Sequence, residues 1–236
     1  MNSRKNSSGM TLLELLVGTA VIMVLIAAAG LQIRGLVQRA KISAAKTTIN
    51  FIALSLKTIK DDTGLYPMEL SHMKEIIPPE GFPQRNWYGP YGKGLSLIDP
   101  WQNPYFYELT EGTIFGPDAY WKKTPPKTDT YFFNAFPGRG TIVITNLGIT
   151  AGRVWLNGVE VVVPNDFKHG YGITKPVTLL ESNTLEIRLT SNPTAQILLK
   201  ITSPFSKNTT FSLGSYGRDK NPGGTKWNAD IIYRDY

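Results

Sequence analysis

The N-terminal part of the chain contains an apolar run that restricts the fold more than any other feature. Residues 15–31 are seventeen consecutive positions of which only Thr19 is polar. With residues 10–13 added, a helix over this segment is long enough to cross a bilayer at about 1.5 Å per residue. Arg4 and Lys5 precede it, and positive charge on that side predicts an N-terminus in the cytoplasm. The rest of the chain would then lie across the membrane.

One acidic residue, Glu14, lies inside this apolar segment, four residues after Met10. A carboxylate at that depth costs about 2.5 kcal/mol or more on insertion scales, so an acid there is a functional candidate. An ordinary secretory signal peptide is cut after its apolar region. Here a short polar leader, residues 1–9, precedes the apolar region instead. The alternative interpretation is a plain signal anchor with an incidental glutamate.

The segment Gly9-Met10-Thr11-Leu12-Leu13-Glu14 resembles the signature of type IV prepilins. The resemblance implies that a prepilin peptidase cuts after Gly9 and methylates the new N-terminal residue, Met10. It also implies that Glu14 pairs with the free amine of a neighbouring subunit, because two charges that are costly alone in hydrocarbon are tolerable as a pair. Many relatives have a proline late in the apolar run, where this chain reads Ala29-Gly30-Leu31. A kink is therefore less expected here.

Beyond the apolar run, a helical pattern continues into the polar part of the chain. Apolar residues recur at alternating spacings of three and four, which indicates one buried helix face. They are Ile42, Ala45, Ile49, Ile52, Leu56 and Ile59. A single helix from residue 11 to about residue 60 would be about 75 Å long. Its first half should pack in a membrane or filament core and its second half against a soluble domain, with residues 61–64 ending it.

Turn-rich segments with aromatic anchors follow the helix and recur near the C-terminus. They are residues 61–67, 87–91, 99–107 and 215–224. In this order they resemble the major pseudopilins of type II secretion systems, and Asp99-Pro100-Trp101-Gln102-Asn103-Pro104-Tyr105 is the most specific part. The resemblance covers residues 9 to about 110 and 211 to 231. It implies a short sheet packed on the long helix and a calcium ion that organises the C-terminal loop.

The chemistry of the C-terminal loop also favours calcium. Its glycine-rich sequence has Asp219 and Asp230 towards its two ends, with Asn228 between them, and the pseudopilin resemblance places all three on family positions. Calcium takes roughly six to eight oxygen ligands, and backbone carbonyls, including that of Tyr216, could complete the set. The chain has no cysteine, so an ion would replace a disulfide as a staple. The alternative interpretation is that these acids only cap turns.

An insertion interrupts the pseudopilin pattern at residues 115–205. It is too long for a structureless loop in a compact domain. Short runs rich in β-branched residues predict strands at residues 141–146, 154–161, 177–180, 185–189 and 197–201, with Asn157-Gly158 as a hairpin turn. At least six closely spaced strands predict a small β-sandwich. The segment 122–129 resembles an entry linker.

These patterns together predict an α+β fold: a long N-terminal helix packed on a small antiparallel sheet, with an inserted β-sandwich. We expect a leader at residues 1–9, a transmembrane or filament helix at 10–60, a pseudopilin core at 61–114 and 206–236, and the insert at 115–205.

Charge and residue patterns restrict the class of function. The net charge of +7 is spread along the chain, without the dense Lys/Arg patch that tracks phosphates, so nucleic acid is not an expected partner. Asp166 and His169 are close in sequence, but no nucleophile motif accompanies them, so no enzymatic site is expected. Trp155, Tyr171 and Phe167 could form a stacking surface for sugar rings, although we favour Trp155 as a core residue.

The leading expectation is a structural subunit of a type II secretion pseudopilus that supports protein export across the outer membrane. The resemblance implies as partners further copies of the chain, prepilin peptidase, minor pseudopilins and the inner-membrane assembly platform. The chain would span the inner membrane once, with its C-terminal domain in the periplasm. The alternative is a surface filament subunit of the type IV pilin kind, whose inserted β-domain is an adhesin or a carbohydrate-binding module.

Overall fold

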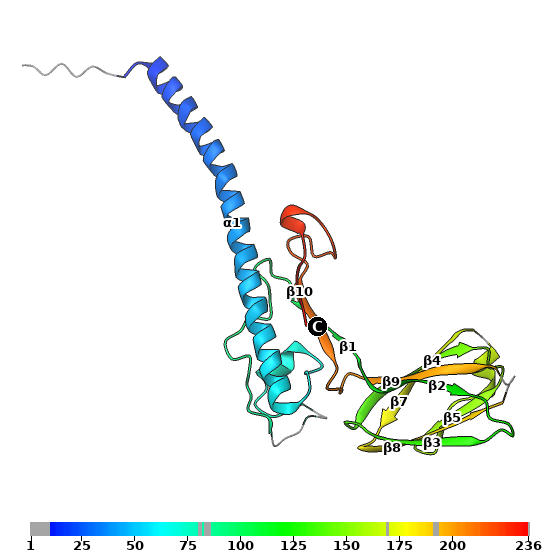
Figure 1. Cartoon of the computed structure of the whole chain (residues 1–236). Coiled ribbons are helices and arrows are strands. Elements are labelled where there is room, and N and C mark those ends of the chain that lie inside the picture. The colour runs from blue at the N-terminus through cyan, green and yellow to red at the C-terminus, as the bar shows by residue number, and fades with distance from the viewer. Residues whose placement is uncertain (1–9, 80–81, 83–85, 169, 191–193, 236) are drawn as a thin grey trace, which may run out of the picture.

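A long helix, a small sheet and a β-sandwich make up the structure (Figure 1). The computed structural model describes residues 10–79, 82, 86–168, 170–190 and 194–235, and only the backbone of residues 28–32 and 227. The small sheet lies beside the C-terminal half of the helix, and the sandwich continues from one end of that sheet. This architecture confirms the predicted α+β fold with an inserted β-domain.

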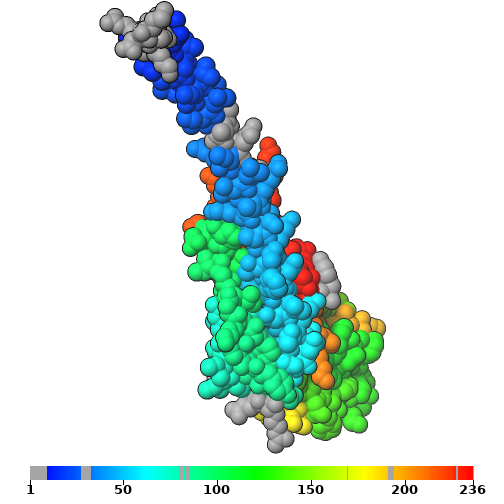
Figure 2. Space-filling view, turned by 90° about the vertical axis from the view of Figure 1, so that its left-hand side faces the viewer, coloured from blue at the N-terminus to red at the C-terminus, as the bar shows by residue number. Residues whose placement is uncertain are grey.

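Helix α1 (Leu12–Thr63) is continuous over 52 residues, three residues longer at its C-terminal end than expected. Gly64 ends it with a left-handed φ of 81°, and its N–H donates to the Lys60 carbonyl oxygen at 2.7 Å. Glycine adopts this conformation without steric cost, which makes it the usual helix stop. Figure 2 shows the N-terminal half of α1, in blue, projecting from the body of the molecule.

The predicted apolar stripe of α1 packs on a three-stranded antiparallel sheet. The sheet has the order β1 (Phe106–Thr110), β10 (Thr210–Ser215) and β11 (Ile231–Arg234). Phe211 and Leu213 of the central strand are buried against the helix. The buried stripe residues are Ala45, Ile49, Ile52, Leu56 and Ile59. The helix and the sheet therefore enclose one hydrophobic core, in which residues of the N-terminal helix pack against residues of the C-terminal strands.

The described part of the segment between α1 and β1 is mostly turns and contains a short 3-10 helix, η1 (Leu70–Lys74). Aromatic side chains fasten it to α1, as the sequence predicts. The Trp101 Nε1–H donates to the Gln38 side-chain oxygen at 3.1 Å. The Tyr91 hydroxyl donates to the Asp62 carboxylate at 2.8 Å. These contacts hold an irregular segment along most of the soluble half of the helix.

The insert is a sandwich of two four-stranded antiparallel sheets. One sheet has the order β2-β9-β4-β7 and the other β3-β8-β5-β6. The strands are β2 (Gly112–Trp121), β3 (Thr128–Asn134), β4 (Gly138–Leu147), β5 (Gly152–Leu156), β6 (Val159–Val162), β7 (Gly172–Leu179), β8 (Ser182–Leu189) and β9 (Gln196–Ser203). A short 3-10 helix, η3 (Pro164–Lys168), joins β6 to β7.

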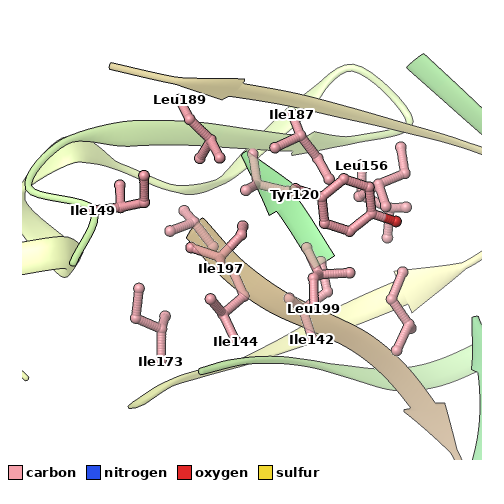
Figure 3. Packing of buried hydrophobic residues seen from close by; sticks show 14 of the residues in the cluster. Tyr120, Ile142, Ile144, Ile149, Leu156, Ile173, Ile187, Leu189, Ile197 and Leu199 are labelled. Carbon is pink, nitrogen blue, oxygen red and sulfur yellow. The ribbon is translucent and has the colours of Figure 1, made fainter. Parts of the chain in front are cut away.

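Alternating apolar residues of both sheets fill the sandwich interior (Figure 3). Ile142 and Ile144 of β4, Ile197 of β9 and Ile187 of β8 are buried, and in Figure 3 they point toward one another. Successive residues of a strand face opposite sides, so residues two apart share the core side. The second core is separate from the one beneath α1.

Two local details of the insert can be compared with the sequence prediction. Asn157 and Gly158 have φ values of 52° and 79°, as a two-residue hairpin turn of the expected kind requires. The segment 122–129 is not the entry to the insert. It leads from β2 to β3 at the far end of the sandwich, and the chain enters through Glu111, directly after β1. Its Pro125-Pro126 pair marks a loop between strands.

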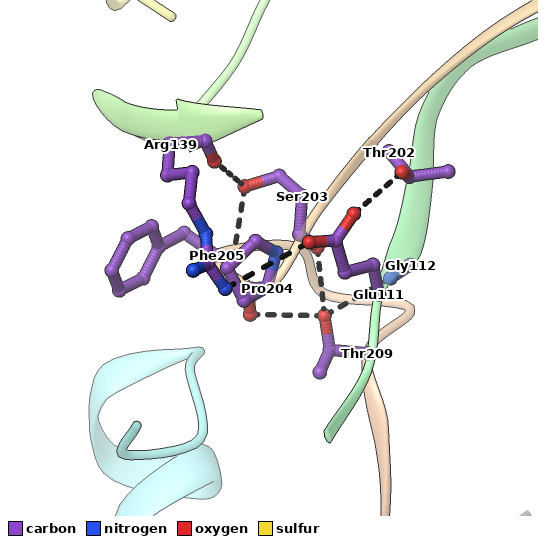
Figure 4. A network of polar contacts seen from close by, with 8 residues as sticks. All are labelled: Glu111, Gly112, Arg139, Thr202, Ser203, Pro204, Phe205 and Thr209. Atoms are coloured by element: carbon purple, nitrogen blue, oxygen red, sulfur yellow. Dashed lines mark hydrogen bonds and ion pairs between the residues drawn. The ribbon is translucent and has the colours of Figure 1, made fainter. Parts of the chain in front are cut away.

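Two neighbouring connections join the insert to the core domain, and a polar network links them (Figure 4). The Thr209 hydroxyl accepts from the Gly112 N–H at 3.2 Å and lies 3.1 Å from the Ser203 carbonyl oxygen. The Glu111 carboxylate accepts from the Thr202 hydroxyl at 2.7 Å. Phe136 and Phe205 pack against the core beneath α1. The insert is therefore held in one orientation by both polar and apolar contacts.

Candidate assembly and calcium sites

Glu14 forms a capping box with Thr11 at the N-terminus of α1. One oxygen of its carboxylate, Oε2, accepts from the Thr11 N–H at 2.9 Å and from the Thr11 hydroxyl at 3.0 Å. The Glu14 N–H donates to the Thr11 hydroxyl oxygen at 3.3 Å. The sequence signal for this role is a Thr followed three residues later by Glu, a pattern typical of helix N-termini that the predictions above did not include.

The capping box leaves part of Glu14 available. Within the described residues, the other carboxylate oxygen, Oε1, has no hydrogen-bond partner. Met10 is exposed directly before the helix, and Gly9 lies outside the described residues. The predicted cleavage point and the predicted pairing group therefore sit at the same end of α1.

The N-terminal half of α1 presents apolar side chains on all sides. Its exposed residues include Leu12, Leu13, Leu15, Leu16, Val21, Ile22, Leu25 and Ile26. A soluble monomer rarely exposes an apolar surface of this extent, so the segment requires a cover. Among the described residues, no helix is long and apolar enough to cross a membrane. The side chains of residues 28–32 lie outside the description. The transmembrane span expected from the sequence therefore remains a prediction.

The block that contains Asp99 and Asn103 supports the base of the C-terminal loop. The buried Asp99 carboxylate accepts from the N–H groups of Trp101 and Asn103 at 2.9 and 2.8 Å. Its second oxygen accepts from the Ser215 hydroxyl at 2.5 Å. The Asn103 amide donates to the Gly217 carbonyl oxygen at 3.0 Å. The sequence marks this block as typical of the family, but its role as a support for the loop depends on contacts between distant residues.

The predicted calcium residues lie on the loop between β10 and β11. The Asp230 carboxylate accepts from the Gly223 N–H at 2.8 Å through Oδ2. Its other oxygen, Oδ1, is buried and has no hydrogen-bond partner among the described residues. A buried, unpartnered carboxylate oxygen is costly unless a cation or water faces it. This unpartnered oxygen is the feature of the loop that best supports a bound ion.

The positions of the other predicted calcium residues give weaker support for a bound ion. Asp219 accepts a long hydrogen bond of 3.4 Å from the Asn221 N–H. Asn228 ends the short 3-10 helix η4 (Lys226–Asn228), and the Tyr216 ring stacks on Phe106 at 4.6 Å. In the described part of the chain, no group of three or more His, Cys, Asp or Glu side chains is placed to hold a metal. A calcium site here needs amide and backbone carbonyl oxygens, which are ordinary calcium ligands.

The aromatic residues considered for sugar stacking do not share a surface. Phe167 is buried, whereas Tyr171 is exposed. Trp155 is partly exposed on the outer side of β5, between the buried Val154 and Leu156. The expectation that Trp155 is a core residue is therefore wrong, because strand alternation places its two neighbours inward.

The structure describes only one member of the Asp166 and His169 pair. His169 lies outside the described residues. The Asp166 carboxylate is engaged in an ion pair with Lys175 at 2.9 Å. The Asp166–Lys175 ion pair thus links η3 to β7.

Comparisons with known proteins identify the N-terminal half of the chain. The family described as "Type II secretion system (T2SS), protein G" matches residues 32–115. The family described as "Prokaryotic N-terminal methylation motif" matches residues 4–30. The type II secretion system core protein G of Xanthomonas campestris pv. campestris is 29% identical over 130 residues, which cover 55% of this chain and 88% of that protein.

A second relative settles the family. The type II secretion system core protein G of Pseudomonas aeruginosa is 36% identical over 120 residues, which cover 50% of this chain and 83% of that protein. The chain belongs to the type II secretion protein G family. Membership confirms the predicted pseudopilin and its role as a structural subunit of a secretion pseudopilus, and it does not favour the surface adhesin. The methylation-motif match supports prepilin processing and a membrane-anchored, filament-assembled protein.

The insert has no such identification. A structure of CBM35 from Paenibacillus barcinonensis is 15% identical, with a TM-score of 0.23, and covers 41% of this chain and 98% of that chain. Dimeric latent PorU from Porphyromonas gingivalis is 11% identical, with a TM-score of 0.22, and covers 42% of this chain and 13% of that chain. These scores are too low to bear on the ligand or role of the insert.

Proposed function

We propose that this pseudopilin assembles through α1, with the Glu14 carboxylate setting the register between subunits. The exposed apolar surface of residues 12–26 supports this proposal most directly, because copies of the same helix can cover it. In this arrangement Oε2 of Glu14 keeps its hydrogen bonds to Thr11 of the same helix. Oε1 accepts a hydrogen bond from the N-terminal amine of Met10 in a neighbouring subunit. The role is structural and non-enzymatic. The inner-membrane assembly platform and minor pseudopilins would be its partners.

Two variants separate capping from assembly. Glu14→Gln keeps an oxygen for the cap but removes the charge, and we expect a loss of filaments recovered by shearing cells that carry the secretion system. Thr11→Val removes the cap and keeps the charge. It should weaken the first helical turn by about 1 kcal/mol and leave assembly largely intact. Normal filament yield from Glu14→Gln would refute the register role, although family membership would stand.

Processing provides an independent test of the N-terminus. We propose cleavage between Gly9 and Met10 by a prepilin peptidase, with methylation of Met10 and a single span that leaves the C-terminal domain in the periplasm. Mass spectrometry of the chain purified from cells with the peptidase should show an N-terminus at Met10 carrying one methyl group. Cells without the peptidase should retain residues 1–9. An unprocessed chain in both strains would contradict this proposal.

We also propose that the C-terminal loop binds calcium. Asp219, Asn228 and Asp230 would supply side-chain oxygens and Tyr216 a carbonyl oxygen, and the ion would neutralise the two carboxylates and staple the loop. The buried Oδ1 of Asp230 supports this assignment. Added calcium should raise the thermal midpoint of the full chain in detergent, and Asp230→Asn should remove that increase. An equal increase in the variant, or with magnesium, would argue against a calcium site.

A further inference from the structure

The end of the insert farthest from the core domain has an unusual surface. The β2–β9 ladder begins with Gly112 opposite Ser203 at the junction and ends with Trp121 opposite Gln196. Figure 1 shows β2 running away from the core domain. A ten-residue strand spans about 30 Å, so the end of β2 at Trp121 lies roughly that far along the sandwich from the junction. We call this end the apex. It comprises residues 121–128, 147–151, 163–168, 170–172, 188–190 and 194–198.

Exposed apolar and aromatic side chains gather at the apex. Trp121 is 56% exposed, Tyr171 is 84% exposed and Leu147 is 41% exposed. Gln196 pairs with both Trp121 and Leu147, which places these residues in one row across three strands. Leu198 lies in the next row of the same outer face and is also exposed. Rigid strands thus hold Trp121, Leu147 and Leu198 exposed around Gln196 on one outer face, and apolar side chains gathered in water are typical of an interaction site.

Basic residues also lie at the apex. Four of them have no ion-pair partner among the described residues: Lys122 and Lys127 in the β2–β3 connection, Lys168 at the end of η3, and Arg188 on β8 of the other sheet. Asp166, the acid of the described apex, and Asp129, directly beside the apex, are both engaged by other lysines. Asp129 pairs with Lys123, and Asp166 pairs with Lys175. The apex therefore carries an excess of positive charge with no internal compensation.

We propose that the apex binds the surface of an anionic phospholipid bilayer. Tryptophan and tyrosine prefer the boundary between headgroups and acyl chains, because one end of each ring system is apolar and the other polar. Lysines beside them are attracted by negatively charged headgroups. The lysine stems can also lie along apolar surface while the ammonium groups stay in water. This combination of exposed leucines, aromatic rings and lysine stems matches a lipid interface.

The shape of the insert also favours a broad surface over an enclosed ligand. Two clefts of the insert lie elsewhere. One, of about 590 Å³, is at the junction and is lined by Phe136, Phe205 and Asn208 among others. The other, of about 930 Å³, lies between β6 and β7, beside Val161 and Val177. The apex instead consists of strand ends and loops that project from the sandwich.

The bilayer at the apex would differ from the one that holds the N-terminal helix. Residues 32–63 of α1 separate the apolar segment from the insert and span about 48 Å. The junction network fixes the insert near the far end of α1. The apex would therefore give an anchored or assembled subunit a second, peripheral membrane contact. This inference does not depend on the calcium proposal or on the role of Glu14.

A flotation assay tests the apex with the full chain held in nanodiscs of neutral lipid. Nanodiscs alone do not float, so the floated fraction reports capture by added vesicles. Vesicles of phosphatidylcholine and phosphatidylglycerol at roughly 70:30 should capture the chain, and pure phosphatidylcholine vesicles should not. The variant Lys122→Glu/Lys127→Glu/Lys168→Glu should lower capture by about tenfold or more. Trp121→Ser should also lower it.

A matched control variant carries the same change in net charge, but at lysines far from the apex. Lys46→Glu/Lys74→Glu/Lys93→Glu alters exposed lysines of α1 and the core domain and should float like the natural chain. Circular dichroism confirms that each variant is folded. Equal capture of the apex and control variants would overturn the proposal. So would a chain that binds soluble polyglutamate but neither vesicle, because that result would identify an acidic polymer as the partner.

Discussion

The Ser215 hydroxyl donates to the Asp99 carboxylate at 2.5 Å, across a sequence separation of 116 residues. Asp99 is only 1% exposed, and its other oxygen accepts two backbone N–H groups from its own turn. One buried carboxylate therefore orders the turn before β1 and fastens the strand that leads into the C-terminal loop. A buried charge is tolerated only when it is fully hydrogen-bonded, which is the case here.

The first prediction concerns this carboxylate. Asp99→Ala leaves two N–H groups and a buried hydroxyl without their acceptor, and it should lower the free energy of unfolding by about 3 kcal/mol. Asp99→Asn keeps one oxygen for the N–H groups and should have a smaller effect. Urea unfolding of the full chain in detergent, followed by tryptophan fluorescence, measures both. Asp118→Asn, at an exposed position of the insert, is the control and should change stability little.

A second prediction concerns two adjacent glycines of the loop. Gly223 and Gly224 both have left-handed φ values, of 95° and 88°, so alanine at either position introduces backbone strain of about 1 kcal/mol. A Cβ at Gly224 would also lie 2.2 Å from the Asn228 carbonyl oxygen, whereas one at Gly223 meets no described atom within 4 Å. Gly224→Ala should therefore reduce both stability and calcium binding more than Gly223→Ala. Calorimetric titration and thermal unfolding compare the two, and equal effects would contradict the steric argument.

A third prediction follows from the tyrosines of the core domain. Burial, with a hydrogen bond to Asp235, raises the pKa of Tyr66 well above its ordinary value, and burial does the same to the pKa of Tyr107. A pKa that is higher in the folded than in the unfolded chain stabilises the fold below the unfolded value, near pH 10. That contribution is lost as the pH rises further. The free energy of unfolding should thus fall between about pH 9.5 and about pH 12.

The Tyr66→Phe variant is the control for this pH effect. It removes one of the groups that must ionise on unfolding, so its stability should decline less steeply with rising pH. Absorbance of tyrosinate, followed beside circular dichroism, should show ionisation of the buried tyrosines together with unfolding. Ionisation of all tyrosines in the folded chain near pH 10 would rule out the mechanism.

A fourth prediction addresses the junction. Thr209→Val removes the oxygen that accepts from the Gly112 N–H and should destabilise the junction by about 1–3 kcal/mol. The chain has no cysteine, so spin labels can be placed on one engineered cysteine in α1 and one in β8. Pulsed electron paramagnetic resonance should give a narrow distance distribution in the natural background and a broader one in Thr209→Val. Thr130→Val, exposed on β3, should keep it narrow.

Local patterns in the sequence predicted several elements correctly. The stripe from Ala45 to Ile59 marks the buried face of α1, because helical spacing places these residues on one side. Gly64 ends the helix and Asn157-Gly158 forms a turn, because each position needs a backbone conformation that few residues adopt. The same reasoning failed for β2, whose ladder shifts register between Thr113 and Asp118. Those irregularities interrupt the alternation by which a strand is recognised.

The sequence by itself thus determined the continuous helix, the prepilin-like N-terminus and the presence of an extra β-domain. These features depend on residues near one another in the chain, where spacing translates directly into a shared face. Tertiary structure alone decided that Asp99 meets Ser215 and that β1 pairs with β10. It also decided that Trp121 and Leu147 share one outward row. Such contacts depend on how distant strands pair, and register between them is set by the packed core as a whole.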